Sequence, residues 1–166
     1  MSVKTGVKRI DIDYEDVAKA KNLATELGHL NNSITKGKGN IYGFIGELIT
    51  AKFLNTKLSN TYDYDLIHNG IKLDVKTKKV SSEPKNYYEC SVANLNTKQD
   101  CDAYVFTRVM NDLSRGWILG FMPKKEYLSK AKFLKKGEVD PSNNWTVSTD
   151  CYNLSISSLK PIEELI

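Results

Sequence analysis

The chain reads YDYDLIHNGIKLDVKTK over residues 62–78, and this stretch predicts a β-hairpin that turns at Asn69-Gly70. Asn-Gly between two runs of alternating residues is the strongest short-range hairpin signal, because both positions of the tight turn need a positive φ. With a two-residue loop, His68 pairs with Ile71, and the register of the whole hairpin follows. The strand after the turn alternates apolar and charged residues, so one of its faces is expected to pack on a core.

Counting outward from the turn fixes the expected positions of the charged side chains. Asp65 lies opposite Asp74, and Asp63 lies opposite Lys76. Opposed side chains project to the same face, with Cβ atoms about 4.5–5.5 Å apart. Two opposed carboxylates repel each other, so the pair indicates a bound cation, and Lys76 projects from the same face as Asp74. The hairpin therefore predicts a metal-dependent hydrolytic site, in which Asp63 is the second choice after Asp65 and suits a structural salt bridge to Lys76.

Length and composition predict one domain that spans residues 1–166. The chain has 166 residues, of which 40% are hydrophobic and 27% are charged, as in an ordinary globular protein. The net charge of +4 permits a nucleic-acid partner but does not require one. Cys90, Cys101 and Cys151 are odd in number and form no C-x-x-C, which argues against a disulfide framework or a zinc site. We expect a cytoplasmic protein, since no run approaches the length of a membrane span.

The remaining patterns predict a mixed α/β architecture. A first helix is expected from Asp13 or Asp16 to about Leu27, with Gly28 as its stop. A second helix is expected over residues 41–54, and it is apolar nearly all round, as a buried helix is. Strands are expected over the following stretches: 87–92, 102–109, 117–122 and 152–156.

Glu47 lies in the middle of this second, apolar helix. Its neighbours on the helical face are small: Gly43, Thr50 and Ala51. Burying an ionised glutamate without a partner is costly, so a cation or strong donors are expected beside Glu47. A less buried helix with a solvated Glu47 is the alternative.

Two further stretches are candidates for contact with nucleic acid. The connector over residues 31–40 alternates glycines with Lys36 and Lys38 before the second helix begins, and its backbone N–H groups and lysines suit a phosphate. A solvated loop is an equally good interpretation. Thr77 and Lys78 follow the hairpin and are expected to touch a DNA backbone. His68 flanks the turn on the face opposite Asp65, so we interpret it as structural.

In chain order, the candidate residues are Glu47 on a helix, then Asp65, then Asp74-Val75-Lys76 on paired strands. This order and spacing resembles the PD-(D/E)XK nuclease superfamily, the restriction-endonuclease-like fold, over about residues 30–122, with 123–166 as a C-terminal extension. The resemblance implies a glutamate-bearing helix, a three-stranded meander, a second helix and a further strand, in a mixed central sheet flanked by helices. The proline that names the motif is absent, because Tyr64 stands before Asp65.

The resemblance implies a divalent-metal-dependent DNA nuclease. Glu47, Asp65 and Asp74, together with the carbonyl of Val75, would hold Mg²⁺ or Mn²⁺ through oxygen ligands. Lys76 would orient a water molecule and stabilise charge on the phosphate. Lys98 and Gln99 match the second helix of the family weakly, as DNA contacts. The chain leaves no room for a separate specificity domain, so we expect recognition of DNA structure, as by a junction resolvase or a repair nuclease, and a homodimer is compatible with this.

Two other functions remain open on the same residues. One is a nucleic-acid-binding protein of this fold that catalyses no reaction, although such a protein has no need of opposed carboxylates. The other is a structural α/β protein in which the acidic pair is salt-bridged to Lys72 or Lys78.

Overall fold

The computed structural model of the chain describes residues 6–31, 40–59 and 61–166. Its helices and strands follow in this order: β1 (Lys8–Asp11), α1 (Tyr14–Asn31), α2 (Asn40–Leu54), β2 (Leu66–His68), β3 (Ile71–Val80), β4 (Glu89–Ala93), η1 (Asn94–Lys98), β5 (Ala103–Met110), β6 (Arg115–Pro123), α3 (Lys124–Lys130), β7 (Lys132–Leu134), β8 (Val139–Asp140), β9 (Trp145–Thr146), β10 (Cys151–Ser155), η2 (Ile156–Ser158) and η3 (Ile162–Leu165), where η marks a 3₁₀ helix. None of the helices in the described ranges is long and apolar enough to cross a membrane.

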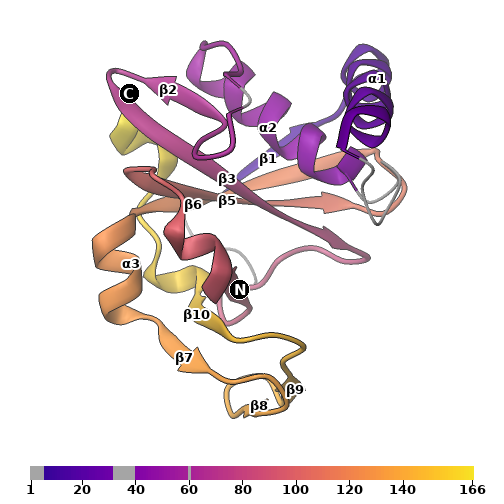
Figure 1. Cartoon of the computed structure of the whole chain (residues 1–166). Helices are drawn as coiled ribbons and strands as arrows, with labels where there is room; N and C mark the ends of the chain where they lie inside the picture. The colour runs from indigo at the N-terminus through magenta and orange to yellow at the C-terminus, as the bar shows by residue number, and fades with distance from the viewer. Residues whose placement is uncertain (1–5, 32–39, 60) are drawn as a thin grey trace.

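A mixed five-stranded sheet with the order β1-β6-β5-β3-β2 lies at the centre of the molecule. β3 and β5 are parallel, and the other neighbours are antiparallel. Figure 1 shows α1 and α2 on one side of this sheet, and α3 with the smaller sheet β4-β10-β7 on the other. The expected mixed α/β architecture, with a mixed sheet and flanking helices, is confirmed.

Each face of the central sheet carries its own hydrophobic core. α2 contributes Ile45 and Ile49 to the first core, against Leu73 and Val75 of β3. The second core lies on the opposite face and contains four large aromatic residues: Tyr104, Phe106, Trp117 and Tyr127. Because both faces are covered, all eight residues of β5 are buried, which accounts for the near-continuous apolar run that predicts a central strand.

The predicted hairpin turn is confirmed. Asn69 and Gly70 have φ angles of 50° and 79°, as a two-residue turn with positive φ at both positions requires. Leu66 pairs with Leu73, and His68 pairs with Ile71.

The predicted extension of this pairing to Asp65 with Asp74 and to Asp63 with Lys76 is wrong, because β2 begins at Leu66 and the strand pairing stops at Leu66–Leu73. The side chains of Asp65 and Asp74 still interact electrostatically. The side chain of Asp65 accepts the Val75 N–H at 2.7 Å, and so occupies the place of a backbone partner. The carbonyl of Asp65 is turned toward the Ser59 N–H, at 2.7 Å. Asp63 instead accepts the backbone N–H of Asp100 at 3.0 Å, which is a structural role with a different partner from the expected lysine.

The first helix begins as predicted and ends later. Asp13 Oδ1 accepts the backbone N–H of Asp16 at 2.9 Å, as a residue that caps a helix N-terminus does. The predicted stop at Gly28 is wrong, since α1 continues to Asn31. A glycine inside a helix costs only about 1 kcal/mol relative to alanine, which a long helix can absorb.

Candidate active site

The candidate site lies where β2 leaves the edge of β3. β2 pairs only with Ile71–Leu73, so β3 has no partner strand on that side from Asp74 onward among the described strands. Val75 and Thr77 face α2, and the alternating Asp74 and Lys76 project from the other face. Glu47 reaches the same edge from α2. Groups from both faces of the sheet therefore meet beside one strand.

Glu47, Asp65 and Asp74 form one electrostatic cluster. Burial, together with the nearby charges of Asp65 and Asp74, raises the pKa of Glu47 to about 9. Burial and the charge of Asp74, partly opposed by the hydrogen bond from the Val75 N–H, raise the pKa of Asp65 to about 7. At neutral pH, Glu47 and Asp65 are therefore not fully ionised unless a cation compensates their charge.

Lys76 supplies one such charge to Asp74. The Asp74 side chain is 6% exposed, and its Oδ2 lies 2.7 Å from Lys76 Nζ in an ion pair that lacks the angles of a hydrogen bond. Lys76 Nζ also donates to Gln99 Oε1 at 3.2 Å, and Gln99 Nε2 donates to the carbonyl of Tyr62 at 2.6 Å. Gln99 therefore positions the lysine, a role that the sequence does not reveal, because the contact joins residues 23 positions apart.

The donor set fits a hard divalent cation. All three side chains offer carboxylate oxygens, which Mg²⁺ and Mn²⁺ prefer. Glu47 Oε1 is buried and has no hydrogen-bond partner among the described residues, so it is an acceptor that a cation would satisfy. As the side chains stand, no group of three or more His, Cys, Asp or Glu within the described ranges is arranged to hold a metal ion. If these residues held a cation, the Lys76 ammonium would have to release Asp74.

The residues predicted to contact DNA lie in different environments. Lys36 and Lys38 fall outside the described residues. Thr77 Oγ1 lies beneath α2, 2.7 Å from Thr107 Oγ1, so its hydroxyl serves the packing of the helix instead of a surface contact. Lys78 and Lys98 are exposed.

His68 lies at the end of the hairpin. Its Nε2 is 3.3 Å from Asn69 Nδ2, and Asn69 Nδ2 also donates to the carbonyl of Leu165 at 3.4 Å. These contacts tie the turn to the C-terminal segment. The interpretation of His68 as a structural residue stays a prediction.

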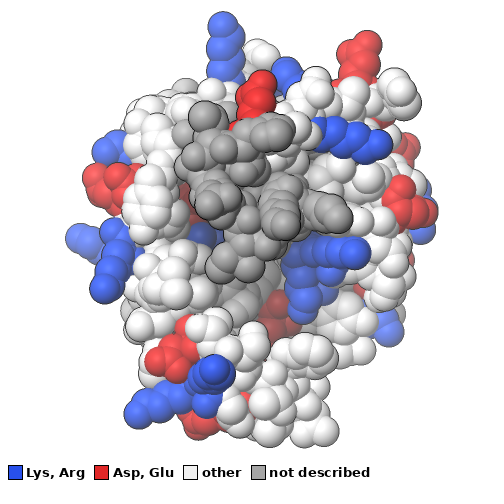
Figure 2. Space-filling model, turned by 45° about the vertical axis from the view of Figure 1, so that its right-hand side comes forward, with Lys and Arg blue, Asp and Glu red and all other residues white. Residues whose placement is uncertain are grey.

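The net charge of +4 does not form one uniformly basic surface on the face that Figure 2 shows. Lys and Arg side chains lie beside Asp and Glu side chains over that face. Local groups, and not the overall charge, must therefore account for any binding of a polyanion there.

The raised pKa values predict a specific pH dependence in metal-free protein. The folded chain keeps protons on Glu47 and Asp65 that the unfolded chain releases near their ordinary pKa values of 4.5 and 3.8. The free energy of unfolding is therefore expected to fall between about pH 4.5 and 9, by at most about 1.4 kcal/mol per pH unit for each group. Urea unfolding with a chelator at pH 5, 7 and 9 measures this, and Glu47→Gln should reduce the fall. Glu83→Gln, at an exposed glutamate, is the control; equal slopes in Glu47→Gln and wild type would contradict the prediction.

The site combines oxygen ligands with a lysine that is positioned by an amide. Such a set can bind a divalent cation and place a positive charge beside a phosphate. No protein-family model matches the chain, and no curated protein matches it in sequence. What the protein does is therefore inferred from its own residues.

Proposed function

We propose that the protein is a deoxyribonuclease that hydrolyses phosphodiester bonds with the help of Mg²⁺ or Mn²⁺. One observation carries the proposal: Glu47, Asp65 and Asp74 share an electrostatic cluster beside Lys76 at the open edge of β3. A purely structural site has little reason to gather three carboxylates around one lysine, because each buried charge costs free energy.

Each residue has a role that follows from its position. Asp65 and Asp74 would hold the cation with Glu47, and the Val75 carbonyl would be a fourth ligand. A bound divalent ion supplies charge that lowers the pKa of water and polarises the scissile phosphate. Asp65 Oδ2 accepts the Val75 N–H at 2.7 Å, which fixes Asp65 beside the residue whose carbonyl would be the fourth ligand. Lys76, once it releases Asp74, would stabilise negative charge on a phosphate oxygen, and Gln99 would keep its ammonium in place.

The arrangement of elements also supports the restriction-endonuclease-like interpretation in part. A glutamate-bearing helix, α2, precedes the antiparallel pair β2–β3, and β5 lies parallel to β3. Two features depart from the family's core. β4 leaves the central sheet and pairs with β10, and a 3₁₀ helix, η1, stands where a second core helix is expected. These departures weaken the resemblance in the elements that follow β3, including η1, which ends beside Gln99, the partner of Lys76.

The test is DNA cleavage by purified protein in Mg²⁺, Mn²⁺ or chelator. Supercoiled plasmid, single-stranded DNA and a branched junction are the substrates, and Asp74→Asn is the matched variant because it keeps the shape of the side chain. We expect metal-dependent cleavage by the wild type and a loss of at least about 100-fold in Asp74→Asn. Binding without turnover would favour the nucleic-acid-binding alternative, for which the ion pair of Lys76 with Asp74 would be the resting state. Undiminished cleavage by Asp74→Asn would remove this site from the mechanism.

A further inference from the structure

A groove lies on the face of the central sheet that is opposite α2. Its larger cavity, of about 530 Å³, opens between β3 and β5 on one side and β4, β9 and β10 on the other. A smaller cavity of about 230 Å³ adjoins it and is lined by Lys76. The two cavities share Lys78, Glu89, Ser91 and Arg108. The shared residues place the two cavities side by side, and together their linings extend from Lys76 of the candidate active site to Trp145.

Arg108 is a buried cation in the wall of both cavities. It is only 5% exposed. Its guanidinium donates one hydrogen bond to the carbonyl of Glu89 at 3.0 Å and lies 5.1 Å from the ring centre of Tyr88. Within the part of the chain that the structure describes, no carboxylate pairs with it. Because a buried charge without a counterion is costly, this guanidinium favours an anionic ligand in the groove.

Lys78 adds a second positive charge to the same wall. In the parallel register of β3 and β5, Lys78 lies directly beside Arg108. Lys78 is exposed over part of its side chain, and the partial burial of the rest lowers its pKa. The charge of Arg108 lowers this pKa further, so the two cations are close enough to repel each other. A phosphate between them would relieve this repulsion and accept hydrogen bonds from both.

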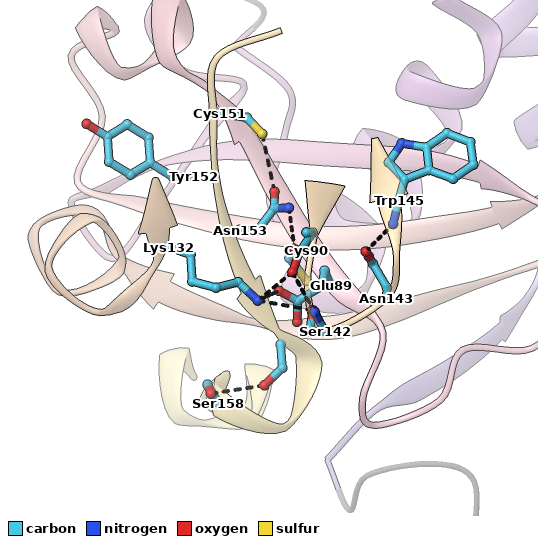
Figure 3. Close-up of polar contacts among 12 residues, drawn as sticks. Glu89, Cys90, Lys132, Ser142, Asn143, Trp145, Cys151, Tyr152, Asn153 and Ser158 are labelled. Atoms are coloured by element: carbon cyan, nitrogen blue, oxygen red, sulfur yellow. Dashed lines mark hydrogen bonds and ion pairs between the residues drawn. The ribbon is translucent and has the colours of Figure 1, made fainter. Parts of the chain in front are cut away.

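Glu89, the one carboxylate among the lining residues of the larger cavity, is ion-paired with a lysine that it shares with Asp140. Lys132 Nζ lies 2.9 Å from Glu89 Oε1 and 2.9 Å from Asp140 Oδ1. Figure 3 shows Lys132 beside Glu89. Asn153 Nδ2 donates a hydrogen bond to Asp140 Oδ2 at 2.9 Å. Lys132 therefore does not form part of an open basic surface. Shared between two carboxylates, it leaves that trio with a net charge of −1, which is less than the two positive charges of Arg108 and Lys78.

Trp145 provides a flat aromatic surface at the mouth of the groove. It is 69% exposed, although a large apolar side chain usually avoids water. Its backbone N–H donates to Asn143 Oδ1 at 3.0 Å, which steadies the short β8–β9 hairpin that carries it (Figure 3). Exposed aromatic rings beside cations are the means by which proteins bind single strands, with bases stacked on rings and phosphates on cations.

We propose that this groove is a binding site for one single strand of nucleic acid, with a phosphate held by Arg108 and Lys78 and a base stacked on Trp145. The strand continues past Lys78 toward Lys76. The assignment of this strand to the substrate rests on the proposed nuclease function. The binding of the strand in the groove does not. A duplex does not suit the groove, because its paired and stacked bases leave no free face for Trp145.

The test measures binding of a fluorescein-labelled ten-nucleotide single strand by anisotropy, in chelator so that no cleavage occurs. We expect Lys78→Ala and Trp145→Ala each to weaken binding at least fivefold, and Lys78→Ala to reduce the slope of log K against log salt by about 0.7. Quenching of tryptophan emission by the strand should be lost in Trp145→Ala. Lys125→Ala and Tyr14→Ala, at exposed residues outside the groove, are the controls and should bind within twofold of wild type. Arg108→Gln should show the largest loss, but both exposed variants decide the outcome even if Arg108→Gln does not fold.

Other outcomes would overturn the inference or separate it from the proposed function. Binding that is unchanged in both Lys78→Ala and Trp145→Ala would overturn it. Equal affinity for a nucleoside 5′-monophosphate and the ten-nucleotide strand would also overturn it, and would assign the groove to a free nucleotide. If the protein cleaves no DNA but binds the strand in a way that depends on Trp145, the groove proposal stands and the nuclease proposal is rejected. If the protein cleaves DNA and neither groove variant changes strand binding, the nuclease proposal stands and the groove proposal is rejected.

Discussion

The Lys76→Met variant is expected to lose about 100- to 1,000-fold of the Mg²⁺-dependent cleavage rate, since it lacks the positive charge beside the phosphate. Methionine keeps the length and apolar body of lysine, so the packing against Phe106 and its neighbours should change little. The rate is measured on whichever substrate the wild type cleaves, at saturating DNA, so that the loss is seen in kcat.

Metal binding separates this effect from a damaged site. In the wild type, the Lys76 ammonium lies 2.7 Å from Asp74 Oδ2 and competes with any cation for that oxygen. Lys76→Met should therefore bind Mn²⁺ as tightly as wild type or more tightly, as measured by calorimetry. Lys72→Met is the matched control on the same strand; Lys72 pairs with Asp100, and its loss should leave the rate within about twofold. Full activity of Lys76→Met, or lost activity together with lost Mn²⁺ binding, would contradict the assigned role.

The Gly46→Ala variant is expected to lose about 3 kcal/mol of unfolding free energy. A Cβ at this position would collide with Thr77 Oγ1 and lie 2.5 Å from Thr107 Oγ1. These hydroxyls bond to each other at 2.7 Å, and Thr107 is buried, so they have little room to move. The helix must then lift from the sheet or the strands must separate. Urea unfolding at pH 7 measures the loss.

Gly43→Ala, one turn earlier on α2, is a matched control. A Cβ there meets nothing within 4 Å, so the variant should gain about 0.5–1 kcal/mol from higher helix propensity. Because α2 carries Glu47, Gly46→Ala should also weaken Mn²⁺ binding, and Gly43→Ala should not. Similar stability of the two variants would contradict the prediction that the close packing of α2 on the sheet depends on Gly46.

Local patterns were sufficient to predict the parts of this structure that depend on neighbouring residues. Asn69-Gly70 determines the turn, because few other pairs tolerate positive φ at both positions, and the Leu66–Leu73 register follows from it. The apolar run over β5 required cover on both faces, and it has that cover. The bounds of α2 agree to within a residue with the predicted ones.

Contacts between distant residues could not be predicted in this way. The hairpin register was extended too far, because nothing in the sequence indicates that Asp65 would use its side chain in place of its backbone to bind Val75. Gln99 was matched only weakly to a DNA contact, whereas its amide links Lys76 to Tyr62 across the chain. Arg108 lies in the stretch 102–109 that predicts a strand, and its lack of a carboxylate partner among the described residues emerges only when β4 is placed beside it.

The open edge of β3 also bears on how the protein avoids associating with itself. From Asp74 to Val80 this strand has no neighbour on one side among the described strands, and an unpaired strand is a template on which a second copy could add. The strand carries Lys76, Lys78 and Lys79 along that length, and two such edges brought together would oppose like charges. The lysines that suit a polyanion would thus also oppose aggregation through the β3 edges. Replacing these lysines is therefore expected to make the protein more prone to aggregate.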